Sequence, residues 1–329
     1  MFRLNIHLFD ITYYYNNGPY VSEPISIVTI HQKNLLTSKN STAKSHGKVL
    51  VHITDQRCQM PAGKPVIEAK DVFRAFIARA DHGKRYPILA LQDASLSIQE
   101  GEFVSFVGPS GCGKSTLLNM VAGIFQPTAG EILYKGKPVT AINTDVGYMT
   151  QDDNLLPWRT LRDNVEVALE FQGMPPEQRH KRAAEYIAKV GLCGFENHYP
   201  HELSGGMRKR CALVRTLIYE PDIILMDEPF GPLDAQTRVI LQDELLKLWD
   251  GTGKTIVFVT HDLVEAIALS DRIVLFSRAP GRIKQVYKVP LSRPRDVFHI
   301  HAAPEFPAFF DRLWRDLKEE ITEVELKAS

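Results

Sequence analysis

The chain has 329 residues, enough for one large domain or two modest ones, and its 44% hydrophobic and 24% charged residues are ordinary for a globular protein. Lysine plus arginine and aspartate plus glutamate both number 39, so the basic excess typical of nucleic-acid-binding proteins is absent. The four cysteines show no metal-site spacing and indicate free thiols in the cytoplasm. We expect no signal peptide and no membrane span, because Asp10 interrupts the N-terminal apolar stretch and no apolar run approaches about 18 residues.

Residues 1–62 differ in composition from the rest of the chain. They contain the polar, turn-rich stretches TSKNSTAKSHGK and QMPAGKP, and short β-like runs without an evident partner. We predict a poorly ordered N-terminal extension. Met60, just before the organised part of the chain, is an alternative natural start.

From Pro65 the pattern alternates between strand-like and helical segments. Strands are predicted at VIEAKDVF, LALQDASLSIQ and GEFVSFVG, and a helix at KSTLLNMVAGI, beginning at Lys114. The chain between about residues 152 and 215 is predicted to be mostly helical, and further strands follow at DIILMDEP, TIVFVTHD, DRIVLFS and RIKQVYKV. Strands alternating with helices predict an α/β fold with a parallel core, whose ligand groups lie at the carboxyl ends of the strands. The helical block predicts an inserted subdomain.

Residues 291–329 are predicted to form a helical tail. Apolar residues recur there at helical spacing and place one stripe on a single face, consisting of Phe306, Phe310, Leu313, Leu317 and Ile321. We expect this stripe to cap the core or the edge of a dimer.

The stretch GPSGCGKST has the spacing of a phosphate-binding loop, between a predicted strand and a predicted helix. Its glycines let backbone N–H groups converge on phosphate oxygens at the positive end of the following helix. Lys114 is suited to neutralise the β- and γ-phosphates, and the Ser115 hydroxyl to ligate Mg²⁺. The predicted nucleotide-binding residues of this loop are Gly108, Pro109, Ser110, Gly111, Cys112, Gly113, Lys114, Ser115 and Thr116.

Two carboxylates end the predicted strand IILMDE. We assign Asp227 to Mg²⁺ and Glu228 to the attacking water, since phosphoryl transfer to water needs both. Neighbouring residues of an extended strand point in opposite directions, so both reach one nucleotide only if the chain turns there. His261 follows another strand and is suited to sense a γ-phosphate. Gln151 can bridge Mg²⁺ and water, although a surface glutamine is the plainer reading of that residue alone.

A second glycine-containing turn, LSGGM at 203–207, precedes a predicted helix. A hydroxyl, flexible amides and a helix N-terminus together form an anion site. Because the first loop already holds one triphosphate, this turn either binds another anion or completes the site of a second copy of the chain placed head to tail.

These motifs occur in the order found in ATP-binding subunits of ABC transporters, and the resemblance covers about residues 65–290. It implies a P-loop NTPase (RecA-like) core with an antiparallel β subdomain and an inserted α-helical subdomain. It also implies ATP and Mg²⁺ as cofactors, and a homodimer that sandwiches two ATP molecules. The family roles fall on Ser204 and Gly206 as the signature acting in trans, Gln151 as the Q-loop, Asp234 as the D-loop aspartate, His261 as the switch histidine and Phe76, with Tyr86 second, as the adenine-stacking aromatic.

The segments QDDNLLPWRTLRDNV, MDEPFGPLDAQTR and SRPRD resemble those of the nitrate/sulfonate/taurine import group. That group often has methionine at the position of Met207. Lys209, Cys211 and Val214 differ from the residues that the family usually has in the following helix. The resemblance implies an integral-membrane permease docking at NLLPW, residues 154–158, and indirectly a solute-binding protein; ordinary core is the alternative reading of that run. It implies a peripheral location on the cytoplasmic face of the inner membrane and no nucleic-acid partner.

The sequence therefore predicts the ATPase of an importer for a small anionic solute such as nitrate, a sulfonate or taurine. The main alternative is a non-transport ABC ATPase acting on nucleic acid or ribosomes. An efflux ATPase and a small-molecule kinase are further alternatives. A small-molecule kinase would not explain the presence of LSGGM and His261. Because Cys112 lies inside the phosphate-binding loop, we expect its alkylation to block nucleotide binding.

Overall fold

The computed structural model describes residues 10–12, 29–31, 65–79 and 85–328. The chain divides into two units, Met1–Gln56 and Arg57–Ser329. In the first unit, β1 (Asp10–Thr12) pairs antiparallel with β2 (Thr29–His31), and the other residues of the predicted extension lie outside the described part. None of the helices in the described ranges is both long and apolar enough to cross a bilayer.

A six-stranded sheet forms the core of the second unit. Its order is β12-β11-β5-β10-β9-β8, with every neighbouring pair parallel except β11 and β12. The strands are β5 (Phe103–Val107), β8 (Val146–Met149), β9 (Ile223–Asp227), β10 (Thr255–Val259), β11 (Arg272–Phe276) and β12 (Ile283–Lys288). All residues of β5 and β10 are buried, and apart from Ser105 and Thr255 they are apolar, as expected where both faces of a sheet are covered.

Alternate residues of these strands enter two hydrophobic clusters on opposite faces of the sheet. In β10, Ile256 and Phe258 belong to the cluster shared with the helices that follow β8, whereas Val257 and Val259 belong to the cluster shared with α1 (Lys114–Val121). Because side chains alternate between the two faces of a strand, the central sheet packs against the helical subdomain on one face and against α1 and the β subdomain on the other.

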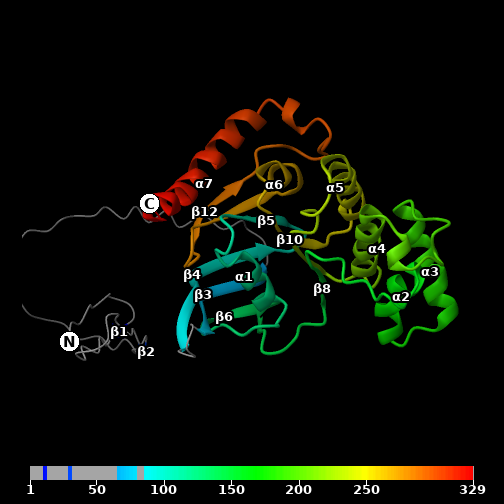
Figure 1. The fold of residues 1–329 in the computed structure, drawn as a ribbon, viewed down its shortest axis with the longest axis horizontal. Helices are drawn as coiled ribbons and strands as arrows, with labels where there is room; N and C mark the ends of the chain where they lie inside the picture. Colours follow the sequence, from blue (N-terminus) through cyan, green and yellow to red (C-terminus); the bar gives the residue numbers. More distant parts are fainter. Residues whose placement is uncertain (1–9, 13–28, 32–64, 80–84, 329) are drawn as a thin grey trace, which may run out of the picture. The chain divides into compact units, whose positions relative to one another are not determined.

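A second, antiparallel sheet lies beside α1 (Figure 1). Its order is β4-β3-β6-β7, and its strands are β3 (Pro65–Arg79), β4 (Arg85–Gln99), β6 (Ala129–Tyr134) and β7 (Lys137–Pro138). Val72, Leu96 and Ile132 from this sheet pack with Leu118 of α1 and Phe106 of β5. The sheet therefore supports the helix that begins at the phosphate-binding loop.

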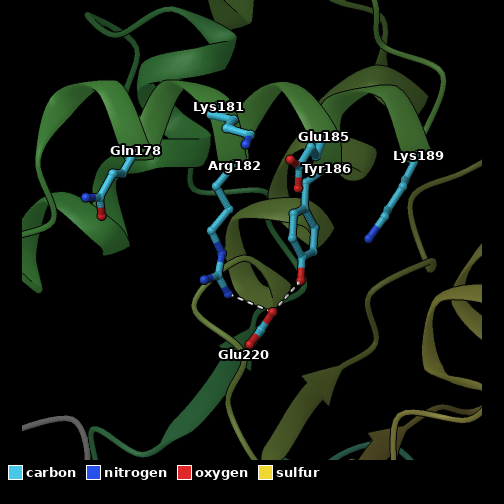
Figure 2. A pocket seen from close by; sticks show the side chains of 7 residues that line it. All are labelled: Gln178, Lys181, Arg182, Glu185, Tyr186, Lys189 and Glu220. Carbon is cyan, nitrogen blue, oxygen red and sulfur yellow. Dashed lines mark hydrogen bonds and ion pairs between the residues drawn. The ribbon is translucent and has the colours of Figure 1, made fainter.

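Three helices are inserted between β8 and β9: α2 (Leu161–Phe171), α3 (Pro176–Lys189) and α4 (Gly205–Leu217), with the short 3₁₀ turn η2 (Pro200–Glu202) before α4. Figure 1 shows them together in green and olive. Thr160 starts α2 through a capping box with Asp163. Two side chains of α3 converge on Glu220 in the turn between α4 and β9, where Arg182 lies 2.8 Å and the Tyr186 hydroxyl 3.3 Å from Oε1 (Figure 2). These contacts fasten the inserted helices to the start of β9.

The remaining helices are α5 (Ala235–Trp249), α6 (Leu263–Leu269), the 3₁₀ turn η3 (Ile300–Ala302) and α7 (Phe306–Ala328). The helix predicted in the tail is present, but its stripe differs in detail, since Phe309 is buried whereas Ile321 is 39% exposed. Lys284 of β12 lies 2.8 Å from Glu319, and the Tyr287 hydroxyl donates to Asp316. α7 therefore packs back onto the last strand of the core sheet.

Candidate nucleotide-binding site

The phosphate-binding loop connects the carboxyl end of β5 to the first turn of α1. Gly111 and Gly113 have φ values of 74° and 97°, in the left-handed region that favours glycine. A Cβ on Gly113 would lie 2.8 Å from Leu91 Cδ2 and 2.9 Å from the Ala90 carbonyl oxygen, so a side chain does not fit there. The Lys114 ammonium donates to the carbonyls of Gly108 and Pro109, each at 2.9 Å, which holds the lysine across the loop.

Gly281, in the turn between β11 and β12, contacts the backbone of this loop, a role that is not predicted from the sequence. Its N–H donates to the Ala90 carbonyl at 2.9 Å, and its carbonyl accepts from Gln92 at 2.9 Å. A Cβ on Gly281 would lie 1.7 Å from the Cys112 carbonyl oxygen. The available signal was a glycine after Ala279-Pro280 between two predicted strands, which indicates a turn but not its contact.

Cys112 itself is fully buried. Burial raises the pKa of its thiol, against the opposing charge of Lys114. Alkylating reagents react with an accessible thiolate, so buried Cys112 is expected to react slowly. Alkylation would block nucleotide binding only after this slow reaction.

Asp227 ends β9 beside the first turn of α1. Its Oδ1 accepts a hydrogen bond from the Ser115 hydroxyl at 2.8 Å. Burial raises the pKa of Asp227, and the neighbouring Glu228 adds to this effect, whereas the Ser115 hydrogen bond and Lys114 oppose it. A hydroxyl and a carboxylate in contact are hard oxygen donors of the kind that Mg²⁺ takes when phosphates and water complete its shell, so these residues fit that ion.

Glu228 adopts φ 43°, so the chain turns directly after Asp227. The turn places Glu228 Oε2 3.4 Å from Nδ1 of His261, which follows β10. A Cβ on Gly231 would lie 3.9 Å from both Gln151 Nε2 and Glu228 Oε2. The structure therefore brings together Glu228, His261 and Gln151 from three different strand ends.

The signature turn caps α4 and touches the segment that contains Asp234. The Ser204 hydroxyl, on an exposed residue, accepts from the Met207 N–H at 3.2 Å and thus caps the helix. Asp234 caps α5 in the same way through the Thr237 N–H at 3.0 Å, and this hydrogen bond lowers the pKa of its carboxyl. A Cβ on Gly206 would lie 2.9 Å from Thr237 Cγ2, so glycine allows the two helix starts to approach closely.

Phe76, the predicted adenine-stacking residue, lies on β3. Its ring meets that of Phe125 edge-on with centroids 5.6 Å apart, and the Arg74 guanidinium lies 4.6 Å from its centroid. Tyr86, the second candidate, lies on β4 and is 48% exposed. The stacking role of either aromatic stays a prediction.

The segment predicted to dock a membrane protein is mixed in character. Leu155 is buried in the core cluster, whereas Trp158 is 71% exposed. All three unusual residues of α4, Lys209, Cys211 and Val214, are buried.

Comparison with known proteins identifies the family. The protein-family model described as ABC transporter matches residues 91–231, which include the phosphate-binding loop, the signature turn and both carboxylates. An uncharacterized ABC transporter ATP-binding protein of Methanocaldococcus jannaschii is 48% identical over 234 residues, covering 71% of this chain and 86% of that protein. The chain belongs to the ABC transporter ATP-binding proteins. It is accordingly an ABC-type ATPase that binds ATP.

The predicted resemblance to the import group is also confirmed. The taurine import ATP-binding protein TauB of Roseobacter denitrificans is 42% identical over 241 residues, covering 71% of this chain and 90% of that protein. A solved dimeric ATP-binding cassette, in a post-hydrolysis state with ADP and Pi, is 35% identical with a TM-score of 0.60, and the match covers 69% of this chain and 100% of that one. The α/β class with a P-loop NTPase core is therefore confirmed.

Proposed function

We propose that this ABC ATPase drives an importer that takes up a small anionic solute, such as nitrate, a sulfonate or taurine, through a separate permease. The observation that carries the proposal is the convergence of Glu228, His261 and Gln151 beside the Ser115–Asp227 pair, in a chain that is similar to taurine import ATPases.

In the proposed reaction, the backbone amides of residues 108–116 hold the ATP phosphates and Lys114 neutralises their charge. Ser115, Asp227 and Gln151 would hold Mg²⁺, which would offset charge on the β- and γ-phosphates. Glu228 Oε2 accepts the proton of the attacking water, and His261 orients that water and the γ-phosphate. The 3.4 Å separation of Glu228 Oε2 and His261 Nδ1 leaves both groups able to reach one water molecule.

We infer that the site is completed by a second copy of the chain. Ser204 and Gly206 lie at an exposed or half-exposed helix start, and the first N–H groups of a helix have no acceptor within the helix itself, which suits a phosphate of the partner's ATP. The dimeric cassettes to which this chain is similar support a two-fold arrangement. Contact of Gly206 with Thr237 would then link the signature turn to Asp234, the proposed D-loop residue, within each protomer.

The permease is proposed to dock on two exposed aromatic residues of the inserted segment, Trp158 before α2 and Phe171 at the end of α2. Trp158 is 71% exposed and Phe171 is 84% exposed, although large apolar side chains are normally covered in a finished assembly. Arg159 and Glu170, each next to one of these aromatics, form an ion pair of 2.6 Å, which joins the two segments. Docking here places the chain on the cytoplasmic face of the inner membrane, with a solute-binding protein acting indirectly through the permease.

The test is membrane recovery of the chain co-expressed with a candidate permease. We expect co-purification, its loss in Trp158→Glu, and its retention in Trp314→Glu, which changes a 46% exposed tryptophan of α7. Both variants keep wild-type ATP affinity if the proposal is correct. Recovery with ribosomes or DNA instead of membranes would establish the non-transport alternative and refute the importer.

A further inference from the structure

The signature helix α4 holds the segment at 151–154 that follows β8. Arg208 Nε donates to Asp153 Oδ2 at 3.0 Å. Arg215 donates to the backbone carbonyls of Asp153 and Asn154 at 2.7 and 2.8 Å. Lys209 Nζ donates to the carbonyl oxygen of Gln151. Three basic residues of α4 therefore fix a backbone segment that has no regular structure of its own.

Lys209 differs from the two arginines in its burial and in its target. It is 4% exposed, and within the described part of the chain its ammonium donates to the Gln151 carbonyl. A buried ammonium carries a large desolvation cost, and a neutral side chain of similar length would fill the same space without it. Stability alone therefore gives a poor explanation for lysine at this position.

The residue that Lys209 holds is the one whose side chain enters the candidate site. The Gln151 carbonyl bonds to α4, while its Nε2 and Glu228 Oε2 both approach the position of a Cβ on Gly231. Fixing the backbone of Gln151 limits where its amide can go relative to Glu228, because only the side-chain torsions remain free.

We propose that Lys209 is a positioning residue for ATP hydrolysis, which acts by holding Gln151 in register with Glu228. This inference rests on the role of Gln151 in the proposed function. It also connects two sites of one protomer: the helix whose first turn would close on the partner's ATP sets the position of Gln151 over the protomer's own ATP.

A double-mutant cycle with the full-length chain tests the proposal, using Lys209→Met, Gln151→Ala and the pair. Methionine keeps the length of the side chain and removes its donor. We expect Lys209→Met to lower kcat by about 10-fold to 100-fold, the range that misplacement of a catalytic group produces. The KM for ATP changes less than about twofold, because the phosphate-binding loop is untouched. In the Gln151→Ala background the same substitution has no further effect beyond about twofold, because coupled residues are not additive.

Controls separate positioning from folding. Lys247→Met removes an exposed lysine of α5 and is expected to keep the wild-type kcat. Lys209→Gln retains an N–H donor and is expected to recover part of the rate. Lys209→Leu, which also lacks a donor, replaces the methionine variant in the cycle if thermal unfolding shows that the latter does not fold.

The outcomes are distinct. Equal loss of kcat from the Lys209 substitution in both backgrounds, or a wild-type kcat for Lys209→Met, overturns the inference while the proposed role of Gln151 stands. A wild-type kcat for Gln151→Ala alone overturns the role of Gln151 in the proposed function, and the role of Lys209 with it.

Discussion

We expect Glu228→Gln to separate ATP binding from ATP hydrolysis in this protein. Glutamine has the shape of glutamate but cannot accept the proton of the attacking water. The loss of a positioned general base costs about 10² to 10⁴ in rate, or ~3 to ~5 kcal/mol of barrier. By contrast, the Glu228–His261 contact at 3.4 Å involves a histidine that is 61% exposed, so its loss costs at most ~1 kcal/mol of folding stability. The catalytic effect is thus larger than the structural one, and the variant is expected to fold.

The assay is phosphate release at saturating Mg-ATP, together with nucleotide binding and sizing in the presence of ATP. We expect kcat to fall at least a hundredfold, the Kd for ATP to change less than about threefold, and an ATP-dependent dimer to accumulate. Glu185→Gln, which changes an exposed carboxylate of α3, is the control and keeps the wild-type rate. A Glu228→Gln protein that hydrolyses ATP at the wild-type rate would refute the assignment of the base.

Three further predictions follow from the same site. Gly281→Ala places a Cβ 1.7 Å from the Cys112 carbonyl and is expected to raise the Kd for ATP at least about tenfold by displacing the loop; unchanged affinity contradicts the support role. Exposed Cys193 is expected to react with iodoacetamide well before buried Cys112, and mass spectrometry that finds the reverse order contradicts the burial argument. Because the pKa of Asp227 is raised in the folded chain, its carboxyl lowers stability as pH rises through and above the ordinary aspartate range. Asp227→Asn removes this titration, so its Tm relative to wild type is expected to increase with pH in nucleotide-free buffer, and a difference independent of pH contradicts the expectation.

The sequence alone determined the elements and the kinds of group at their ends. Buried parallel strands are nearly continuous apolar runs, and a glycine loop followed by Lys114 has a spacing that depends only on neighbouring residues. For the same reason the predicted strands, the helix at Lys114 and the α/β class follow from local pattern. That Ser204 begins a helix also follows from local capping preferences.

Tertiary structure decided what no local pattern encodes, namely which distant residues touch. The turn at Glu228 that aims it at His261, the contact of Gly281 with the back of the phosphate-binding loop, and the burial of Lys209 against Gln151 each join segments far apart in the chain. Such contacts depend on how the sheet and the inserted helices pack, and packing is set by the whole set of buried side chains rather than by any one stretch.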